Sequence, residues 1–167
     1  MLRTTFTDLM LLELRPSHAR ELYELLQNNR DHLTAHGDYQ EEVSASLAEV
    51  EAELADESRN GLRFGIFLAR DLIGCMDLVP VDPPRYGLGY WLDQHKIGKG
   101  YATAALRALV GHAKNALKAS DLYAGVTHGN KRSVALLSRA GFSPVADFEK
   151  YTRYHLPLIS DALPRKS

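Results

Sequence analysis

The amino-acid sequence predicts an α/β fold in which helices cover both faces of one mixed sheet. Helical and strand-like patterns follow one another in the order strand, helices, three strands, helix, strand, helix, strand, which is typical of layered α/β architectures. The 167 residues with 45% hydrophobic content are enough to bury one continuous core. We therefore expect a single domain over residues 1–167, with a loosely held tail at about 158–167.

The N-terminal part is predicted to contain one strand and two helices. Residues 8–14 indicate a strand, and apolar residues recur on one helical face within 16–28. The stretch 28–40 has no clean period and is rich in His, Asp and Asn, so we expect a surface loop or short irregular helices there. Apolar residues at spacings of four, three and four indicate an amphipathic helix over 43–54.

The central part of the chain changes to strand patterns. Residues 62–69 and 72–79 predict a hairpin around a tight turn, and 86–93 continues with aromatic and apolar residues. The segment "PVDPP" at 80–84 is expected to interrupt the strands, because proline cannot donate to a sheet ladder. These strands together predict an antiparallel meander, which a helix over 102–117 follows.

The last three predicted elements complete the sheet. Residues 122–127 indicate a strand, and 130–142 indicate a helix that Gly141 closes. Residues 147–158 are predicted to form the final strand.

Composition and charge exclude several classes of function. The formal net charge is -1 and no extended basic run is present, so we expect no nucleic-acid partner. No apolar stretch approaches the roughly 20 residues that span a bilayer, and the N-terminus lacks the order of a signal peptide. We therefore expect a cytoplasmic protein with no membrane partner. Cys75, the only cysteine, lies in an apolar run, which favours a buried side chain over a nucleophile.

A glycine motif, "IGKGYATAAL" at 97–106, precedes a predicted helix and indicates an anion site. Helix N-termini present unpaired N–H groups, and glycines let a ligand approach the backbone closely. The motif does not fit the P-loop pattern. It departs from the dinucleotide fingerprint at Thr103, and Asp121 falls at the wrong end of the next strand to bind a ribose. A helix that starts with glycines and binds nothing stays open at this point.

Two segments together resemble the GNAT superfamily of N-acetyltransferases, in particular its branch of ribosomal-protein N-terminal acetyltransferases. They are "YWLDQHKIGKGYATAALRALV" and, about thirty residues later, "NKRSVALLSRAGF". The resemblance extends from about Leu9 to Leu158. The family pattern Q/R-x-x-G-x-G/A falls on Ile97, Gly100 and Ala102, and Ile97 departs from it.

The resemblance implies a twisted, mostly antiparallel GNAT-like sheet that binds acetyl-CoA as the acetyl donor. A splayed pair of strands, 86–93 and 122–127, would hold the pantetheine arm, and backbone amides at the glycine motif would bind the diphosphate. No metal is needed in this family. The residues expected to bind the cofactor are Tyr90, Trp91, Leu92, Ile97, Gly98, Lys99, Gly100, Tyr101, Ala102, Thr103, Asn130 and Ser133.

The catalytic residues follow less directly from the resemblance. Relatives often carry a glutamate where this chain has Gly87, so a built-in carboxylate base is missing from its expected place. The substitute bases are His128, just past the strand at 122–127, and His36 with Asp38 in the loop after the first helix, because a histidine pKa near 6.5 suits neutral pH. Ser133 is the expected proton donor to the leaving thiolate, with Tyr151 and Tyr154 as weaker candidates.

The acceptor side is expected in the segment 28–60, where His36, Asp38 and Tyr39 are the candidate substrate-binding residues. His32 and His36 lie four apart, but no clear third ligand accompanies them, so no metal site is expected. The predicted reaction is direct transfer of acetyl to a primary amine, with a homodimer as the remaining partner expectation. A protein or peptide N-terminus, a small metabolite and an antibiotic all stay open as acceptors, as does an acyl-CoA-binding module without turnover.

Overall fold

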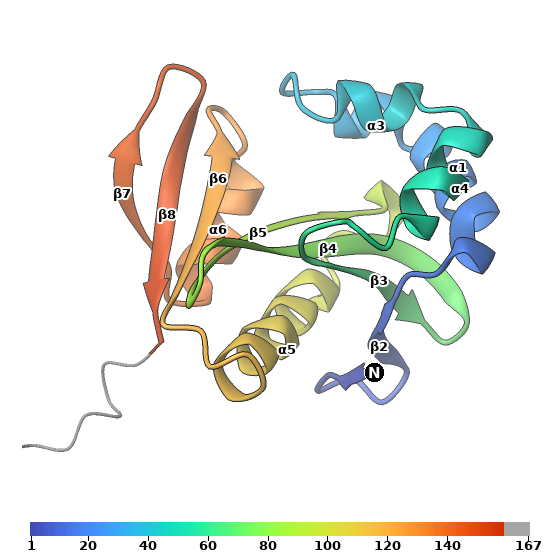
Figure 1. The fold of residues 1–167 in the computed structure, drawn as a ribbon. Coiled ribbons are helices and arrows are strands. Elements are labelled where there is room, and N and C mark those ends of the chain that lie inside the picture. Colours follow the sequence, from blue (N-terminus) through green and yellow to red (C-terminus); the bar gives the residue numbers. More distant parts are fainter. Residues whose placement is uncertain (159–167) are drawn as a thin grey trace, which may run out of the picture.

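One eight-stranded sheet organises the protein (Figure 1). The structure is a computed structural model that describes residues 1–158, so residues 159–167 of the expected tail lie outside the described residues. The strand order is β1-β2-β3-β4-β5-β6-β8-β7. The strands are β1 (Leu2–Arg3), β2 (Leu9–Glu13), β3 (Leu62–Leu68), β4 (Asp71–Asp82), β5 (Arg85–Leu92), β6 (Asp121–Thr127), β7 (Ser143–Asp147) and β8 (Tyr151–Pro157). Neighbouring strands are antiparallel, except that β5 and β6 are parallel. This confirms the predicted mixed, mostly antiparallel sheet.

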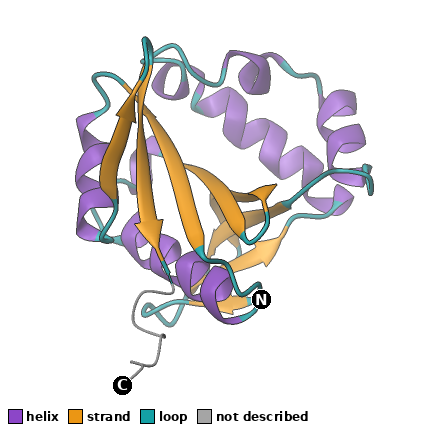
Figure 2. Cartoon of the chain, turned by 60° about the vertical axis from the view of Figure 1, so that its left-hand side comes forward, coloured by secondary structure: helices purple, strands orange, loops and turns teal. Residues whose placement is uncertain are grey.

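Helices cover both faces of this sheet, as predicted (Figure 2). They are η1 (Pro16–His18), α1 (Ala19–Asn28), α2 (Arg30–Leu33), α3 (Gln40–Ser44), α4 (Leu47–Ala55), η2 (Gln94–Lys96), α5 (Tyr101–Asn115) and α6 (Lys131–Arg139). The buried side chains of α5 and α6 join one apolar cluster with those of the sheet. The buried side chains of α1, α3 and α4 join a second cluster on the other face.

Alternation along β4 explains how one strand serves both clusters. Successive side chains of a strand point to opposite faces. Met76 and Leu78 are each 1% exposed and belong to the α5 cluster, whereas Cys75 belongs to the α1 cluster. The Asp77 side chain lies on the same face of β4 as Cys75 and borders a cavity beside α4 instead of the core. A carboxylate thus stands on the α1 and α4 face of a central strand.

The parallel pair β5 and β6 stays together for a short distance and then separates. Three residues of each strand pair, from Arg85 with Asp121 to Gly87 with Tyr123. Beyond them β5 runs on to Leu92 without β6 beside it, while β6 pairs with β8 along its whole length. This is the splayed pair that the family resemblance implied, and it leaves a gap between the two strands.

The prolines after residue 79 do not end β4 where the sequence predicted a break. The strand continues to Asp82, and the register with β5 shifts between Pro80 and Asp82. A bulge is one of the few sheet positions that tolerate proline, because the residue there need not donate to the ladder. Pro83 and Pro84 then form the turn into β5.

Two other boundaries differ from the sequence predictions. The single helix expected over 43–54 is divided, because Ala45 is extended and Ser46 begins α4 in a reciprocal cap with Glu49. The last strand expected over 147–158 is β8 alone, and β7 precedes it as an unpredicted edge strand. Its sequence, "SPVAD", is short and mostly exposed, so it carries little apolar pattern.

Candidate active site

A cavity of about 230 Å³ opens where β5 and β6 separate. The α2–α3 segment closes its third side. The predicted site residues that line it are His36, Asp38, Tyr39, Tyr90, Trp91, Leu92, Ile97, Ala102, Asn130 and Ser133. His36 and Ser133, which lie 97 positions apart in the sequence, therefore meet at one gap in the sheet. We call this cavity the cleft.

The N-terminus of α5 opens the helix with exposed backbone. Gly98 and Gly100 have φ angles of 85° and 87°, a left-handed region that glycine adopts without strain. Within the described chain no side chain caps α5, and no atom lies within 4 Å of the position a Cβ would take at Gly98. The helix dipole and free N–H groups at such an end attract anions. The described residues therefore fit the diphosphate of a CoA molecule.

Side chains around this helix end have separate roles. Ile97 is half-buried against the core, so its departure from the family pattern replaces a polar contact with packing. Tyr101 packs edge-on against Phe6 with ring centroids 5.1 Å apart, which fixes the first turn of α5. Arg139, on α6, donates from Nη2 to Thr103 Oγ1 at 3.2 Å. Lys99 is exposed.

A hydrogen-bonded chain joins β5 to α6 inside the cleft. The Tyr90 hydroxyl donates to Ser133 Oγ at 3.1 Å, and Asn130 Oδ1 accepts from the Ser133 backbone N–H at 3.2 Å. Burial raises the pKa of Tyr90, although its bond to Ser133 opposes this. Tyr90 therefore keeps its proton and acts as a donor. Because Ser133 accepts that bond, its own hydroxyl proton is left to donate elsewhere.

The α2–α3 segment spans the mouth of the cleft. Thr127, at the end of β6, hydrogen-bonds the Asp38 carboxylate. The Tyr39 hydroxyl donates to the Tyr90 carbonyl at 3.0 Å, and His32 Nε2 lies 3.2 Å from the Leu92 carbonyl oxygen. Burial, together with the charges of nearby carboxylates, raises the pKa of Tyr39, so this phenol stays neutral. The segment thus holds both splayed strands.

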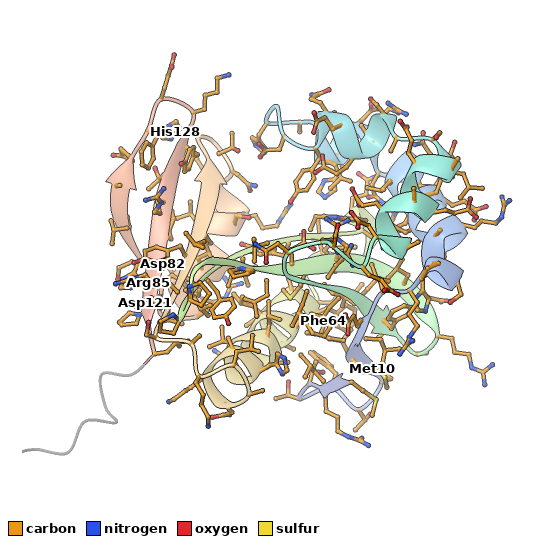
Figure 3. All side chains as sticks on the ribbon, in the orientation of Figure 1. Met10, Phe64, Asp82, Arg85, Asp121 and His128 are labelled. Atoms are coloured by element: carbon orange, nitrogen blue, oxygen red, sulfur yellow. The ribbon has the colours of Figure 1, made fainter. Side chains whose placement is uncertain are left out.

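His36 and His128 differ in their position relative to the cleft. His36 lines it, beside the turn at Gly129. His128 is exposed and directly follows β6, and its Nε2 lies 2.8 Å from the Phe148 carbonyl oxygen, so Nε2 carries the proton (Figure 3). The structure does not bring His128 to the cleft with Ser133, and its catalytic role stays a prediction.

One carboxylate near the gap, that of Asp77 on the α1 and α4 face of the sheet, was not among the predicted site residues. Asp77 lines a second cavity of about 490 Å³ between α1, α4 and β4, together with Glu53 and Arg63. Arg63 Nε donates to Asp77 Oδ1 at 2.8 Å and Arg63 also pairs with Glu53. Burial opposes the charge of Arg63, but the two carboxylates outweigh it and raise its pKa. The detectable signal was one acidic residue inside the apolar strand "LIGCMDLV".

Cys75 lies beside this second cavity but is not suited to attack a thioester. It is 4% exposed, and burial raises the pKa of its thiol well above the ordinary range. The thiolate is the nucleophilic form of cysteine. A buried neutral thiol agrees with the packing role that its apolar neighbours predict.

Residues 1–158 contain neither a metal-binding cluster nor a membrane-spanning helix. Within that part of the chain no group of three or more His, Cys, Asp or Glu side chains is placed to hold a metal ion. No helix within it is long and apolar enough to cross a membrane.

Comparison with known proteins places these features in one family. The model of the acetyltransferase (GNAT) domain matches residues 8–143. The Bacillus subtilis (strain 168) protein "Putative ribosomal N-acetyltransferase YdaF" is 29% identical over 136 residues, which cover 77% of this chain and 74% of that protein. "Probable N-acetyltransferase YjcK" of the same organism is 39% identical over 84 residues, 47% of this chain and 46% of its own length.

Solved structures show the same fold. A RimL ribosomal L7/L12 alpha-N-protein acetyltransferase, in complex with coenzyme A, superposes with a TM-score of 0.85 at 20% identity, covering 96% of this chain and 100% of that one. The ribosomal-protein-S5-alanine acetyltransferase of Vibrio fischeri gives 0.82 at 17% identity, covering 96% and 98%. Since the family model matches residues 8–143, which include strands β2 to β6 and helices α5 and α6, this chain belongs to the GNAT acetyltransferase family.

Proposed function

We propose that this acetyltransferase moves the acetyl group of acetyl-CoA to the free α-amine of a protein or peptide N-terminus. The Tyr90–Ser133 hydrogen bond inside the cleft carries the proposal, because it sets a hydroxyl donor between the splayed strands. The uncapped start of α5 supports the choice of a CoA thioester as donor. The names of YdaF and of the RimL structure support a ribosomal or other protein N-terminus as acceptor.

The proposed reaction is direct and needs no covalent enzyme intermediate. The acceptor nitrogen attacks the thioester carbonyl, so that a C–N bond forms and the C–S bond breaks. The amine proton leaves to solvent, and the CoA sulfur takes a proton donated through Ser133. Tyr90 holds the Ser133 hydroxyl in the orientation that this donation requires.

The cost of deprotonating the acceptor favours an α-amine. At pH 7 an α-amine with a pKa near 7.8 costs about 1.1 kcal/mol to deprotonate, and a lysine near 10.4 costs about 4.6 kcal/mol. Gly87 offers no carboxylate base, and the Asp77 carboxylate is already paired with Arg63. A site with little basic assistance suits the acceptor that loses its proton most readily.

The test is to incubate the protein with acetyl-CoA and a panel of amines while measuring release of free thiol. The panel holds peptides with free N-termini, the same peptides with lysine as their one free amine, and small polyamines and aminoglycosides. We expect thiol release with the N-terminal peptides and mass addition at their α-amine. Transfer to small amines alone would contradict the peptide acceptor, and CoA binding without transfer to any amine would indicate a binding module.

A further inference from the structure

Two cavities adjoin the gap between β5 and β6. Four residues, Leu88, Gly89, Ala124 and Gly125, line both the cleft and a third cavity of about 370 Å³. Asp77 and Val79 of β4 and Tyr151 of β8 also line this third cavity. On β4 the cavity therefore lies on the face that α1 and α4 cover. Gly89 brings no side chain into the gap, whereas the ring of Tyr151 lies 3.1 Å from the position a Cβ would take at Gly125.

Asp77 stands at the α1 and α4 side of this gap. It pairs with Gly89 in the β4–β5 ladder, and directly paired residues of antiparallel strands point to the same face. No atom of the described chain lies within 4 Å of the position a Cβ would take at Gly89. Asp77 also lines both the 490 Å³ cavity and the 370 Å³ cavity. Asp77 therefore lies between the two cavities, opposite Gly89 at the edge of the gap.

The bonds of Asp77 leave it able to bind a cation. Its Oδ1 accepts from Arg63 Nε at 2.8 Å, while Oδ2 lies 3.5 Å from Arg63 Nη2. Arg63 is shared with Glu53, so two carboxylates divide one guanidinium and the three groups carry one net negative charge. A carboxylate has two oxygens with about four acceptor positions, and the Asp77 side chain is 35% exposed.

We propose that the Asp77 carboxylate binds the acceptor nitrogen, as a cationic primary amine that enters from the face opposite α5 and α6. This inference rests on the proposed function and names the residue that recognises its acceptor. The ammonium donates to Asp77, loses one proton to solvent, and reaches the thioester through the opening beside Gly89. Arg63 and Glu53 hold the carboxylate in place and do not touch the acceptor.

The test uses Asp77→Asn, which keeps the shape of the side chain and removes its charge. Asp82→Asn is the matched control, because Asp82 lies on the same strand, pairs with Arg85 at the surface (Figure 3) and lines none of these three cavities. Steady-state thiol release is measured with a ten-residue peptide that has a free α-amine. For Asp77→Asn we expect KM for the peptide to rise about 10- to 100-fold, as loss of a charge-assisted hydrogen bond implies. KM for acetyl-CoA is expected to stay the same, and Asp82→Asn is expected to match the wild type.

A binding measurement separates this inference from the proposed function. Calorimetry in the presence of CoA compares the free peptide with the same peptide acetylated at its N-terminus. We expect the wild type to bind the free peptide more tightly and Asp77→Asn to bind both alike, with an unchanged melting temperature. Equal binding of the two peptides by the wild type, or a preference that survives in Asp77→Asn, would overturn the role of Asp77. A preference that depends on Asp77, without any thiol release, would instead refute the proposed function alone.

Discussion

Tyr90 and Ser133 show how two ordinary hydroxyl groups become one directed donor. Tyr90 is kept neutral by burial and donates to Ser133, which leaves the serine proton available to a leaving group. Asn130 fixes the same serine through its backbone N–H. The value of the pair lies in orientation, because neither hydroxyl has a pKa low enough to transfer a proton readily to water at neutral pH.

Substitution of these hydroxyls tests the role of orientation. We expect Ser133→Ala to lower kcat about 100-fold, in the range for loss of a proton donor, and Tyr90→Phe to lower it less. The affinity for CoA should change little in both variants. Ser138→Ala, an exposed serine on the same helix, is the control and should keep full activity. A wild-type kcat in Ser133→Ala would remove this serine from the chemistry.

A second prediction at this scale concerns the single cysteine. Because Cys75 is buried and its thiol is neutral, iodoacetamide at pH 7.5 should neither label the folded protein nor reduce its activity. Mass spectrometry of the treated protein checks this, with urea-unfolded protein as the positive control. Rapid labelling of the folded chain would show that the space beside Cys75 opens to reagents.

Single residues also show where sequence reasoning reached its limit. The glycine motif and Ser133 were found because their spacing is local, and the structure brings Ile97, Ala102 and Ser133 to one cleft. Asp77 was missed because its importance depends on the β4–β5 register, which no local pattern fixes. The expected base position at Gly87 carries no side chain, whereas a carboxylate stands on the neighbouring strand.

At the scale of elements, α5 joins two tasks that impose different demands. Its N-terminus must present backbone to an anion, and its body must fill the core with Leu106 and Leu109, which are fully buried. The left-handed glycines at 98 and 100 serve the first demand. The apolar stripe serves the second, and it was this stripe that allowed the helix to be predicted within two residues at each end.

Gly98→Ala tests the first demand. An alanine at a φ of 85° is strained, so the free energy of unfolding should fall by about 1–2 kcal/mol. CoA binding should weaken by up to about tenfold, because helix-end contacts depend on this backbone path. Gly111→Ala in the body of α5 is the matched control, since it has room for a Cβ and should stabilise the helix by about 0.5–1 kcal/mol. Equal CoA affinity in both variants would contradict the anion site.

Elements were predicted well where apolar periodicity is strong and less well where polar contacts decide. The split between α3 and α4 follows from the cap formed by Ser46 and Glu49, a short polar pattern that lies within a continuous apolar stripe. β7 was missed because an exposed edge strand has no buried face to give alternation. Both differences change boundaries and leave the topology intact.

At the scale of the whole molecule, the two parts of the sheet meet along a short ladder. Strands β1 to β5 and strands β6 to β8 join at three residue pairs. At this junction Asp121 Oδ1 lies 2.7 Å from His155 Nε2 on β8, and its Oδ2 accepts from Ser120 at 2.8 Å. The ring of Tyr123 stacks on His155 with centroids 4.9 Å apart.

These contacts predict how stability changes in acid. The bond to His155, then that to Ser120, lowers the folded-state pKa of Asp121 below its ordinary 3.8. The unfolded state therefore binds the proton first, so the contribution is fully present above pH 3.8 and is lost as pH falls through the lowered value. Urea unfolding from pH 6 to pH 2.5 should show a smaller loss of stability in Asp121→Asn than in the wild type. Asp82→Asn, an exposed carboxylate, is the control and should follow the wild type.

The two cavities that adjoin the β5–β6 gap have a consequence for the order of events in a catalytic cycle. If the acceptor enters from the face opposite α5 and α6, as we propose for Asp77, the two substrates reach the site by separate routes, so neither has to leave before the other binds. Free CoA should then inhibit in competition with acetyl-CoA but not with the amine, and the acetylated peptide should compete with the amine alone. The splay of β5 from β6 would thereby let each product compete only with the substrate that uses the same route into the site.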